Sequence, residues 1–189
     1  MNPLLIPFVW SMSPRGDISF ADCIITHAGG RRVDGSPGLM NELMAKVVKT
    51  LPSHLSIFTQ GDLADLLPND QLLAVTPPQN ASDETRRDWL ESIGVIKKAP
   101  YYIESRDIAL RHKKMCDERG FKHPILVAYN PHMPRAYWAA RKVGLDVIIP
   151  KIPPAVYDPL CSQKWMRSRV YNGLREIGAR GRDFLLGNI

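Results

Sequence analysis

The sequence predicts an α/β fold: a three-layer, Rossmann-like, doubly wound and mainly parallel sheet of about five to six strands. Two observations predict it. Short apolar runs alternate along the chain with stretches of helical periodicity, a pattern typical of βαβ crossovers. The runs are nearly continuous in apolar residues, as expected of parallel strands that helices cover on both faces. The length of 189 residues then fits one domain, 1–189, large enough to bury a core.

The expected strands are compact apolar segments bounded by turn residues. They cover residues 23–26, 55–59, 101–103, 124–128 and 146–149. The segment 67–80 contains several prolines and polar turn residues, so we expect a long loop there, with a lid as one interpretation.

The expected helices cover residues 37–51, 81–93, 106–119, 131–143 and 162–186. Ser82 is the expected N-cap of the second helix, and Gly120 is expected to end the third. The last helix forms most of a C-terminal segment, 160–189. Its potential breaks are Gly173, Gly178 and Gly181.

The N-terminal arm, residues 1–20, opens with an apolar decapeptide. That decapeptide contains two prolines and lacks a basic start, so we do not interpret it as a signal peptide. No run of eighteen apolar residues exists in the chain, and we therefore expect no membrane span. The arm could pack either on its own domain or on a dimer partner, so a homodimer is one of the expectations.

The three cysteines, Cys23, Cys116 and Cys161, are widely spaced and form no C-x-x-C pair. This pattern fits a reduced, cytoplasmic protein better than a disulfide scaffold or a zinc site. Cys23 lies within an expected strand, where we interpret it as a small buried hydrophobe. The sequence shows no set of metal ligands at suitable spacing, so we expect no metal site.

The formal net charge of +6 favours anionic partners. Basic residues are densest at 111–114 and 167–182, both on expected helices, where a solvated face and a site for a phosphate-bearing ligand or nucleic acid are the alternatives. His112 is expected on such an exposed helix face. The aromatic residues do not interleave with the basic ones, which disfavours nucleic acid as a partner.

Polar and glycine residues follow the expected strands, at the edge of the sheet where doubly wound folds bind their ligands. Glycines there let the backbone approach a ligand, and arginines can pair with an anion. A tight turn alone would also explain the Gly29-Gly30 pair, which is not a G-x-G-x-x-G fingerprint. The candidate ligand-binding residues are Gly29, Gly30, Arg31, Thr59, Gln60, Gly61, Glu104, Asn130 and Arg135.

His132 and Arg135 form the most informative pair, because they stand three residues apart in the first turn of an expected helix. Free backbone N–H groups at that position favour an anion. His132 is therefore a candidate general acid or base, and Arg135 a candidate anchor for phosphate or carboxylate. The alternative is structural: His132 caps the helix and Arg135 pairs with a nearby carboxylate.

With these residues in view, the chain resembles the SanA/YdcF/ElyC-like family of bacterial domains. The resemblance spans roughly residues 21–180 and departs from the family pattern in the second and fourth motifs. The segments that carry it are Ala28-Gly29-Gly30-Arg31-Arg32-Val33-Asp34-Gly35-Ser36-Pro37, Thr59-Gln60-Gly61, Asp83-Glu84, Ile93-Gly94-Val95, Ile103-Glu104, His132-Met133-Pro134-Arg135-Ala136 and Arg175-Glu176-Ile177-Gly178.

The resemblance implies a soluble member of that family with a small-molecule pocket at the carboxyl ends of the strands. A nucleotide-like or phosphorylated ligand is expected, with S-adenosylmethionine or a nucleotide as candidate cofactor. Glu84, at the acidic helix start, would handle protons together with His132 in a transferase or hydrolase. A module that senses a metabolite without turning it over is the alternative.

Overall fold

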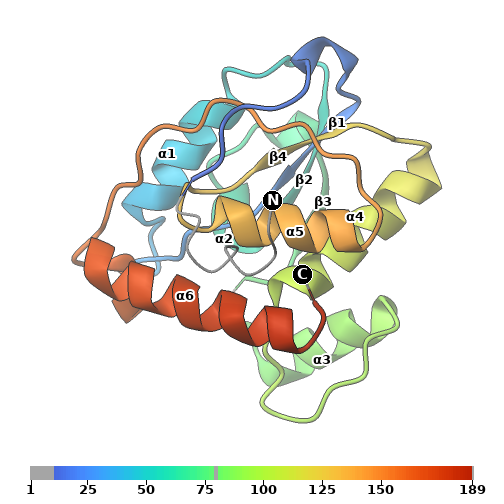
Figure 1. Ribbon diagram of the computed structural model, residues 1–189. Helices are drawn as coiled ribbons and strands as arrows, with labels where there is room; N and C mark the ends of the chain where they lie inside the picture. The colour runs from blue at the N-terminus through green and yellow to red at the C-terminus, as the bar shows by residue number, and fades with distance from the viewer. Residues whose placement is uncertain (1–10, 79–80, 189) are drawn as a thin grey trace.

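A computed structural model describes residues 11–78 and 81–188 of the chain. Its described residues form a four-stranded sheet in the order β3-β2-β1-β4, with every neighbouring pair parallel (Figure 1). The strands are β1 (Cys23–Thr26), β2 (Ser56–Gln60), β3 (Leu72–Thr76) and β4 (Pro124–Val127). The predicted α/β class with a parallel sheet is confirmed, with four strands in place of five to six.

Helices connect these strands, and most lie where the sequence predicts them. They are α1 (Leu39–Val48), α2 (Gly61–Ala64), α3 (Asp83–Ser92), α4 (Ser105–Arg119), α5 (Met133–Lys142) and α6 (Arg169–Leu185), with short 3-10 turns η2 (Ile18–Phe20), η3 (Asn69–Gln71) and η4 (Lys164–Met166). Ser82 caps α3 by accepting a hydrogen bond from the Thr85 amide. Gly120 ends α4 in a left-handed conformation with φ of 73°, as expected.

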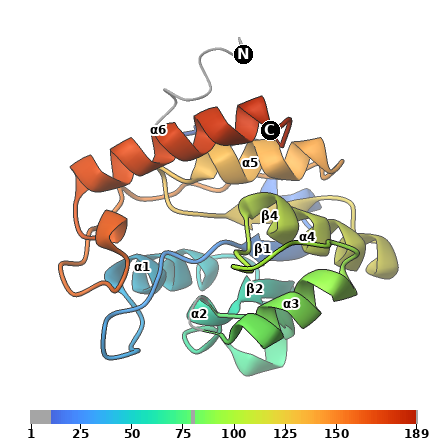
Figure 2. The ribbon, with the colours of Figure 1, turned by 90° about the horizontal axis from the view of Figure 1, so that it is seen from below.

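Alternate residues of the strands build two separate apolar clusters, one on each face of the sheet. Ile24 lies in register with Ile57 and Ile125, and this row packs against α1. The next row, which contains Ile25 and Phe58, packs against α4 and α5. In Figure 2, α1 lies on one side of the strands and α4 on the other, with α6 outermost beyond α5. Helices therefore cover both faces of the sheet, which explains why its strands are uniformly apolar.

The predicted strand at 146–149 is reduced to isolated bridges. Ile148 pairs in parallel with Ile125 of β4, and Ile149 pairs with Arg15 on its other side. Pro150 follows at once and has no N–H to donate, so the pairing stops there. This segment adds backbone hydrogen bonds beside β4 without becoming a full strand.

Two further expectations were wrong. Residues 101–103 form no strand: Tyr102 and Ile103 instead line a cleft at the end of the sheet, and β-propensity counts only where a partner strand is available. Conversely, β3 lies within the predicted long loop 67–80. Four of its five residues pair in parallel with β2, and the prolines on both sides hid this short edge strand from sequence reasoning.

The C-terminal helix α6 runs without interruption through its three glycines, so none of the potential breaks is used. Part of the N-terminal arm is described: Arg15 joins Ile149 by two backbone hydrogen bonds. Residues 1–10, on which the prediction of an apolar arm rests, lie outside the described residues. Among the described residues, no helix has the length and apolar content needed to cross a bilayer.

Candidate functional site

The strand order reverses between β1 and β4, and this reversal places the candidate site. From β1 the chain builds β2 and β3 on one side, and it then returns to place β4 on the other. The segments that follow β1 and β4 consequently leave the sheet in different directions. A crevice forms at such a point outside the carboxyl ends of parallel strands, where open α/β sheets bind ligands.

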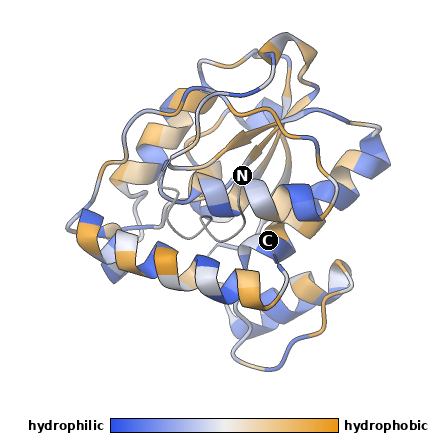
Figure 3. Cartoon of the chain, viewed as in Figure 1, coloured by the Kyte–Doolittle hydropathy of each residue, from blue (hydrophilic) through white to orange (hydrophobic). Residues whose placement is uncertain are grey.

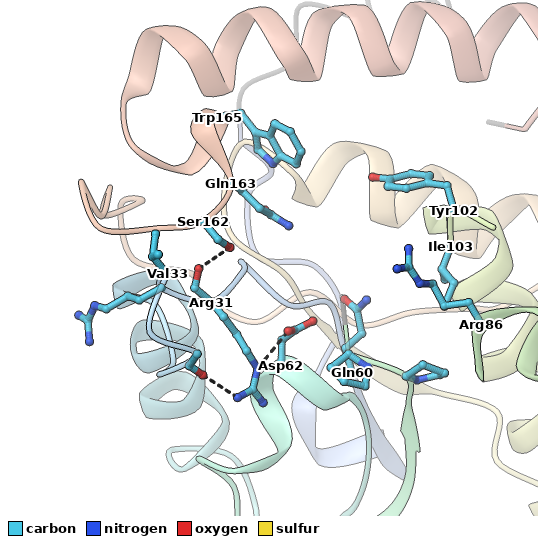
Figure 4. Close-up of a pocket in the computed structure, with 14 residues that line it drawn as sticks. Arg31, Val33, Gln60, Asp62, Arg86, Tyr102, Ile103, Ser162, Gln163 and Trp165 are labelled. Atoms are coloured by element: carbon cyan, nitrogen blue, oxygen red, sulfur yellow. Dashed lines mark hydrogen bonds and ion pairs between the residues drawn. The ribbon is translucent and has the colours of Figure 1, made fainter. Parts of the chain in front are cut away.

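A cleft of about 400 Å³ opens at this end of the sheet (Figure 4). Gln60, at the end of β2, lies in its floor, with Trp165 and Gln163 on one wall and Tyr102 on the opposite wall. Most of its lining is polar or aromatic. The lining residues are Arg31, Arg32, Val33, Gly35, Gln60, Asp62, Pro77, Pro78, Arg86, Tyr102, Ile103, Ser162, Gln163 and Trp165.

A smaller recess adjoins the cleft and shares Gln60, Tyr102 and Trp165 with it. His27, the residue after β1, and His132, at the N-cap of α5, both line this recess. Their rings meet there, with His27 Nδ1 3.4 Å from His132 Nε2. The recess thus brings together the two segments that diverge at the reversal of strand order.

The imidazoles of His27, His132 and His112 pack against one another at the recess. Tyr129 stacks on His132 with 5.3 Å between ring centroids, and His112 lies edge-on to His27 at 5.8 Å. The prediction that His112 lies on an exposed helix face was wrong: it is 1% exposed, because Ile108, Ala109 and Met115-Cys116 place it on the core face of α4. Neither of its ring nitrogens has a hydrogen-bond partner among the described residues.

Burial keeps these histidines neutral. It lowers the pKa of His132 to about 4, with the positive charge of Arg135 as a further cause. Burial likewise lowers the pKa of His112 to about 3, and it lowers the pKa of His27 well below its ordinary value, helped by His132 and His112. At neutral pH each imidazole therefore carries one proton and offers one basic nitrogen.

Arg135 meets Glu176 of α6 in a buried two-point ion pair. Its Nε and Nη2 donate to the two carboxylate oxygens at 3.1 Å each. Burial alone would raise the pKa of Glu176, but the charges of Arg135 and the contact with His132 hold that pKa well below its usual range. Glu176 Oε1 also lies 3.6 Å from His132 Nδ1. The carboxylate therefore sits beside both residues of the predicted His-x-x-Arg pair.

The structural alternative, in which His132 caps the helix and Arg135 pairs with a nearby carboxylate, is true in part. His132 occupies the N-cap position of α5, yet its side chain makes no capping hydrogen bond. Arg135 does pair with a carboxylate, although Glu176 is distant in sequence rather than nearby. Both side chains still line the small recess. An anion there would share a guanidinium that already holds one carboxylate.

The Gly29-Gly30 turn is fixed by a side chain that sequence reasoning missed. Buried Asn41 of α1 accepts from the Gly29 amide at 2.6 Å and donates to the Gly30 carbonyl at 2.8 Å and to the Asp62 carbonyl. A Cβ at Gly29 would lie 2.5 Å from Met40, so only glycine fits. The Gly29 amide is thus already bonded, and this glycine serves close packing.

Arg31 lines the cleft with its guanidinium tied to its surroundings. It contacts Asp62 at 3.1 Å and Asp65 at 2.7 Å, and it donates to the carbonyls of Gly35 and Gly61. Gln60 accepts a hydrogen bond from the Ala28 amide and lines both the cleft and the recess. Of the predicted ligand-binding residues, Gln60, Arg31 and Arg135 are therefore the ones whose side chains reach the lining.

The remaining predicted residues lie elsewhere. Thr59 is buried within the sheet, where its hydroxyl pairs with that of Thr26 at 2.6 Å. Asn130 donates to the carbonyls of Ile152 and Pro153, and Glu104 accepts from Arg182 of α6. Glu84 is exposed on the first turn of α3 and lines neither cavity. The acidic companion that the structure places beside His132 is Glu176.

For two of the missed residues, Glu176 and His27, the sequence contains a signal. Glu176 lies in the R-E-x-x-G segment near the C-terminus, where it is one of two acidic residues in a basic helix. His27 directly follows the first strand. Tyr102 and Trp165 had no such signal, since they come from irregular segments that only the folded chain brings to the cleft.

Fold and cleft together define an α/β protein with an arginine-lined cleft at the carboxyl edge of a four-stranded parallel sheet. Among the described residues no group of three or more His, Cys, Asp and Glu has the geometry of a metal site. No protein-family model matches the chain, and neither a curated protein nor a solved structure matches it.

Proposed function

We propose that this protein binds an anionic, nucleotide-like small molecule in the cleft and acts on it with His132. The observation that carries the proposal is the neutral His27–His132 pair, which opens into the cleft where the strand order reverses. A buried neutral imidazole beside a fixed carboxylate is a suitable acid–base group. The layout is consistent with the Rossmann-like fold, and with the SanA/YdcF-like resemblance, that the sequence suggests.

The lining supports the proposed ligand class. Five arginines, but only one carboxylate, contribute to the two cavities, which favours a negatively charged guest. Tyr102 and Trp165 stand on opposite walls (Figure 4). Arg175 links them, because its guanidinium lies over the Trp165 ring at 4.5 Å and donates to the Tyr102 hydroxyl at 2.9 Å. An aromatic base would stack on these rings in place of that guanidinium. The Gln60 amide in the floor offers a polar contact. A nucleotide combines these charged and planar parts, and S-adenosylmethionine offers an adenine and a carboxylate.

His132 is the proposed catalytic base, and Glu176 a positioning residue. His132 Nε2 would take a proton from a substrate hydroxyl or from water, as required in a transferase or a hydrolase, once the substrate displaces the 3.4 Å contact between this nitrogen and His27 Nδ1. Glu176, beside Nδ1, stabilises the imidazolium that forms. His27 faces the other ring nitrogen and limits how the His132 ring can turn.

Calorimetric titration with ATP, ADP, AMP and S-adenosylmethionine tests binding. We expect at least one to bind, and Gln60→Glu to weaken that binding about tenfold or more, because it places a negative charge in the floor. Glutamate keeps the oxygen that accepts from the Ala28 amide, so the fold is preserved. Failure of every probe to bind would overturn the proposal.

Turnover of the bound compound tests the role of His132. We expect His132→Asn to lower turnover about 100-fold or more while binding changes little. His54→Asn, which removes an exposed histidine outside the cleft, serves as the matched control. Equal turnover in the wild type and His132→Asn would refute the assigned role.

Binding without turnover is the second candidate function. It is favoured by the ion pairs that Arg31 forms with Asp62 and Arg135 forms with Glu176. Because both guanidinium groups already hold carboxylates, they are less able to stabilise new charge in a transition state. A ligand that binds and is recovered chemically intact would identify a metabolite sensor.

A further inference from the structure

Helix α6 is turned with its polar side inward. Its buried side chains are Asn172, Glu176, Arg180 and Asp183. Its outward side carries large apolar residues: Val170 is 70% exposed, Leu174 65% and Leu185 83%. Figure 3 shows these apolar bands along α6, which lies on the outside of the molecule. An amphipathic surface helix ordinarily does the opposite and buries its apolar face.

The outward apolar residues lie along one face of α6. Positions 170, 174, 178, 181 and 185 follow one another at spacings of three and four, which places them on one face of a helix. Valine and leucine occupy three of these positions and glycine the other two, so this apolar stripe contains no polar side chain. Large apolar side chains exposed together on one face mark an interaction site in a soluble domain.

The exposed charges next to the stripe are cationic. Lys164 and Arg167 are exposed just before the start of α6. Arg169 is exposed too, but it precedes buried Asn172 by three residues and so lies on the inward face of the helix. The acidic residues of the segment 164–188 are Glu176 and Asp183, and both are buried. Lys164 and Arg167 also line a surface recess of about 450 Å³, together with the aromatic rings of Trp165 and Tyr171.

We propose that α6 docks on an anionic lipid surface, lying in the plane of the headgroups. The apolar stripe enters the boundary with the acyl chains, while Lys164 and Arg167 meet lipid phosphates. Trp165 and Tyr171 have the amphipathic rings that favour the headgroup level. A second copy of the chain fits less well: paired helices would set this cationic cluster against its own copy or against Arg182.

Co-sedimentation of the full chain with lipid vesicles tests the proposal. We expect binding to phosphatidylcholine vesicles that contain phosphatidylglycerol, and about tenfold weaker binding to phosphatidylcholine alone. Leu174→Glu/Leu185→Glu should lower binding about tenfold or more, because both charges enter the apolar stripe. Ile96→Glu is the matched control, since Ile96 is 92% exposed outside α6.

A charge-reversal pair tests the cationic cluster separately. Lys164→Glu/Arg167→Glu should abolish the preference for phosphatidylglycerol, whereas Lys49→Glu/Lys151→Glu, at exposed sites elsewhere, should keep it. Circular dichroism confirms that each variant is folded. Absence of vesicle binding, or equal binding by the Leu174→Glu/Leu185→Glu protein, overturns the proposal. The proposal also fails if the wild-type protein is a dimer and Leu174→Glu/Leu185→Glu makes it a monomer without changing vesicle binding.

Discussion

The guanidinium of Arg135 and the carboxylate of Glu176 face each other through two hydrogen bonds in the interior, with side chains 5% and 0% exposed. This pair joins α5 to α6 directly behind the recess. Both charges have lost their water, so they depend on nearby opposite charges for compensation. Besides each other, Arg135 has Asp183 at 3.8 Å, and Glu176 has Arg175 at 2.9 Å. The relationship explains why a helix with so polar an inner face packs on this domain.

Removing one partner of this pair should be costly. We expect Glu176→Gln to lower the free energy of unfolding by about 3–5 kcal/mol, because buried Arg135 would keep only the more distant contact with Asp183 as a counter-charge. Chemical denaturation measures the change. The double variant Arg135→Met/Glu176→Leu should lose less than the two single variants together, and strict additivity would show that the side chains are energetically independent.

Stability should fall as the pH decreases. His27, His112 and His132 have pKa values below the ordinary 6.5, so in the unfolded chain they take up protons that the folded protein does not bind. The free energy of unfolding should therefore decrease from about pH 6.5 downward, by about 1 kcal/mol per pH unit for each histidine. Glu176, whose pKa is lowered, adds a further loss at more acidic pH.

Urea denaturation at a series of pH values checks this slope. His112→Phe should make it shallower by the contribution of one histidine, and it should leave stability at neutral pH unchanged or higher, because neither ring nitrogen of His112 has a partner among the described residues. His54→Asn controls for the loss of a histidine. A slope that His112→Phe does not change would contradict the assigned burial effect.

Glycine substitutions should separate a packed position from an open one. Gly29→Ala should lower stability by about 1–3 kcal/mol, since its Cβ would overlap Met40 in the core. Gly178→Ala should raise stability by about 0.5–1 kcal/mol, because this helical position has open space around it. Thermal unfolding of both variants provides the comparison. A stable Gly29→Ala protein would show that the turn after β1 adapts easily.

The three thiols should resist modification in the folded protein. Cys23 is 0% exposed, and Cys116 and Cys161 are each 1% exposed. The hydrogen bond to Cys116 and burial raise the pKa of Cys23, and burial raises the pKa of Cys161, so little thiolate forms at these two residues. The hydrogen bond with Cys23 lowers the pKa of Cys116, so the protection of Cys116 comes from its burial. We expect a thiol reagent to react on the order of 100 times more slowly than in denaturant. Rapid labelling of the native protein would contradict this packing.

Sequence reasoning located most of the fold because periodicity and caps are local signals. Ser82 and Gly120 mark their helices within a single turn of chain, and the run at 124–127 has no polar interruption. The strand β3 was missed since its five residues stand between prolines. Residues 101–103 have the composition of a strand, but the fold offers them no neighbour.

The candidate site was predictable only where a motif follows a strand. His132 and Arg135 were found in this way, and both line the recess. Glu176 and Asn41 were not assigned roles, since their importance comes from contacts between α-helices and distant loops that no local pattern encodes. Long-range pairing, rather than residue type, decides which charged side chains are enclosed.

Asn41 has a consequence for how the cleft could change over time. Its one amide ties the Gly29-Gly30 turn to the backbone at Asp62, so the base of the cleft is fixed from within the protein. Tyr102 and Trp165, in contrast, project from irregular segments on the two walls. Those walls can accept new residues while the base stays unchanged. The same scaffold could therefore acquire a different ligand preference through a few wall substitutions, at little cost to its folding.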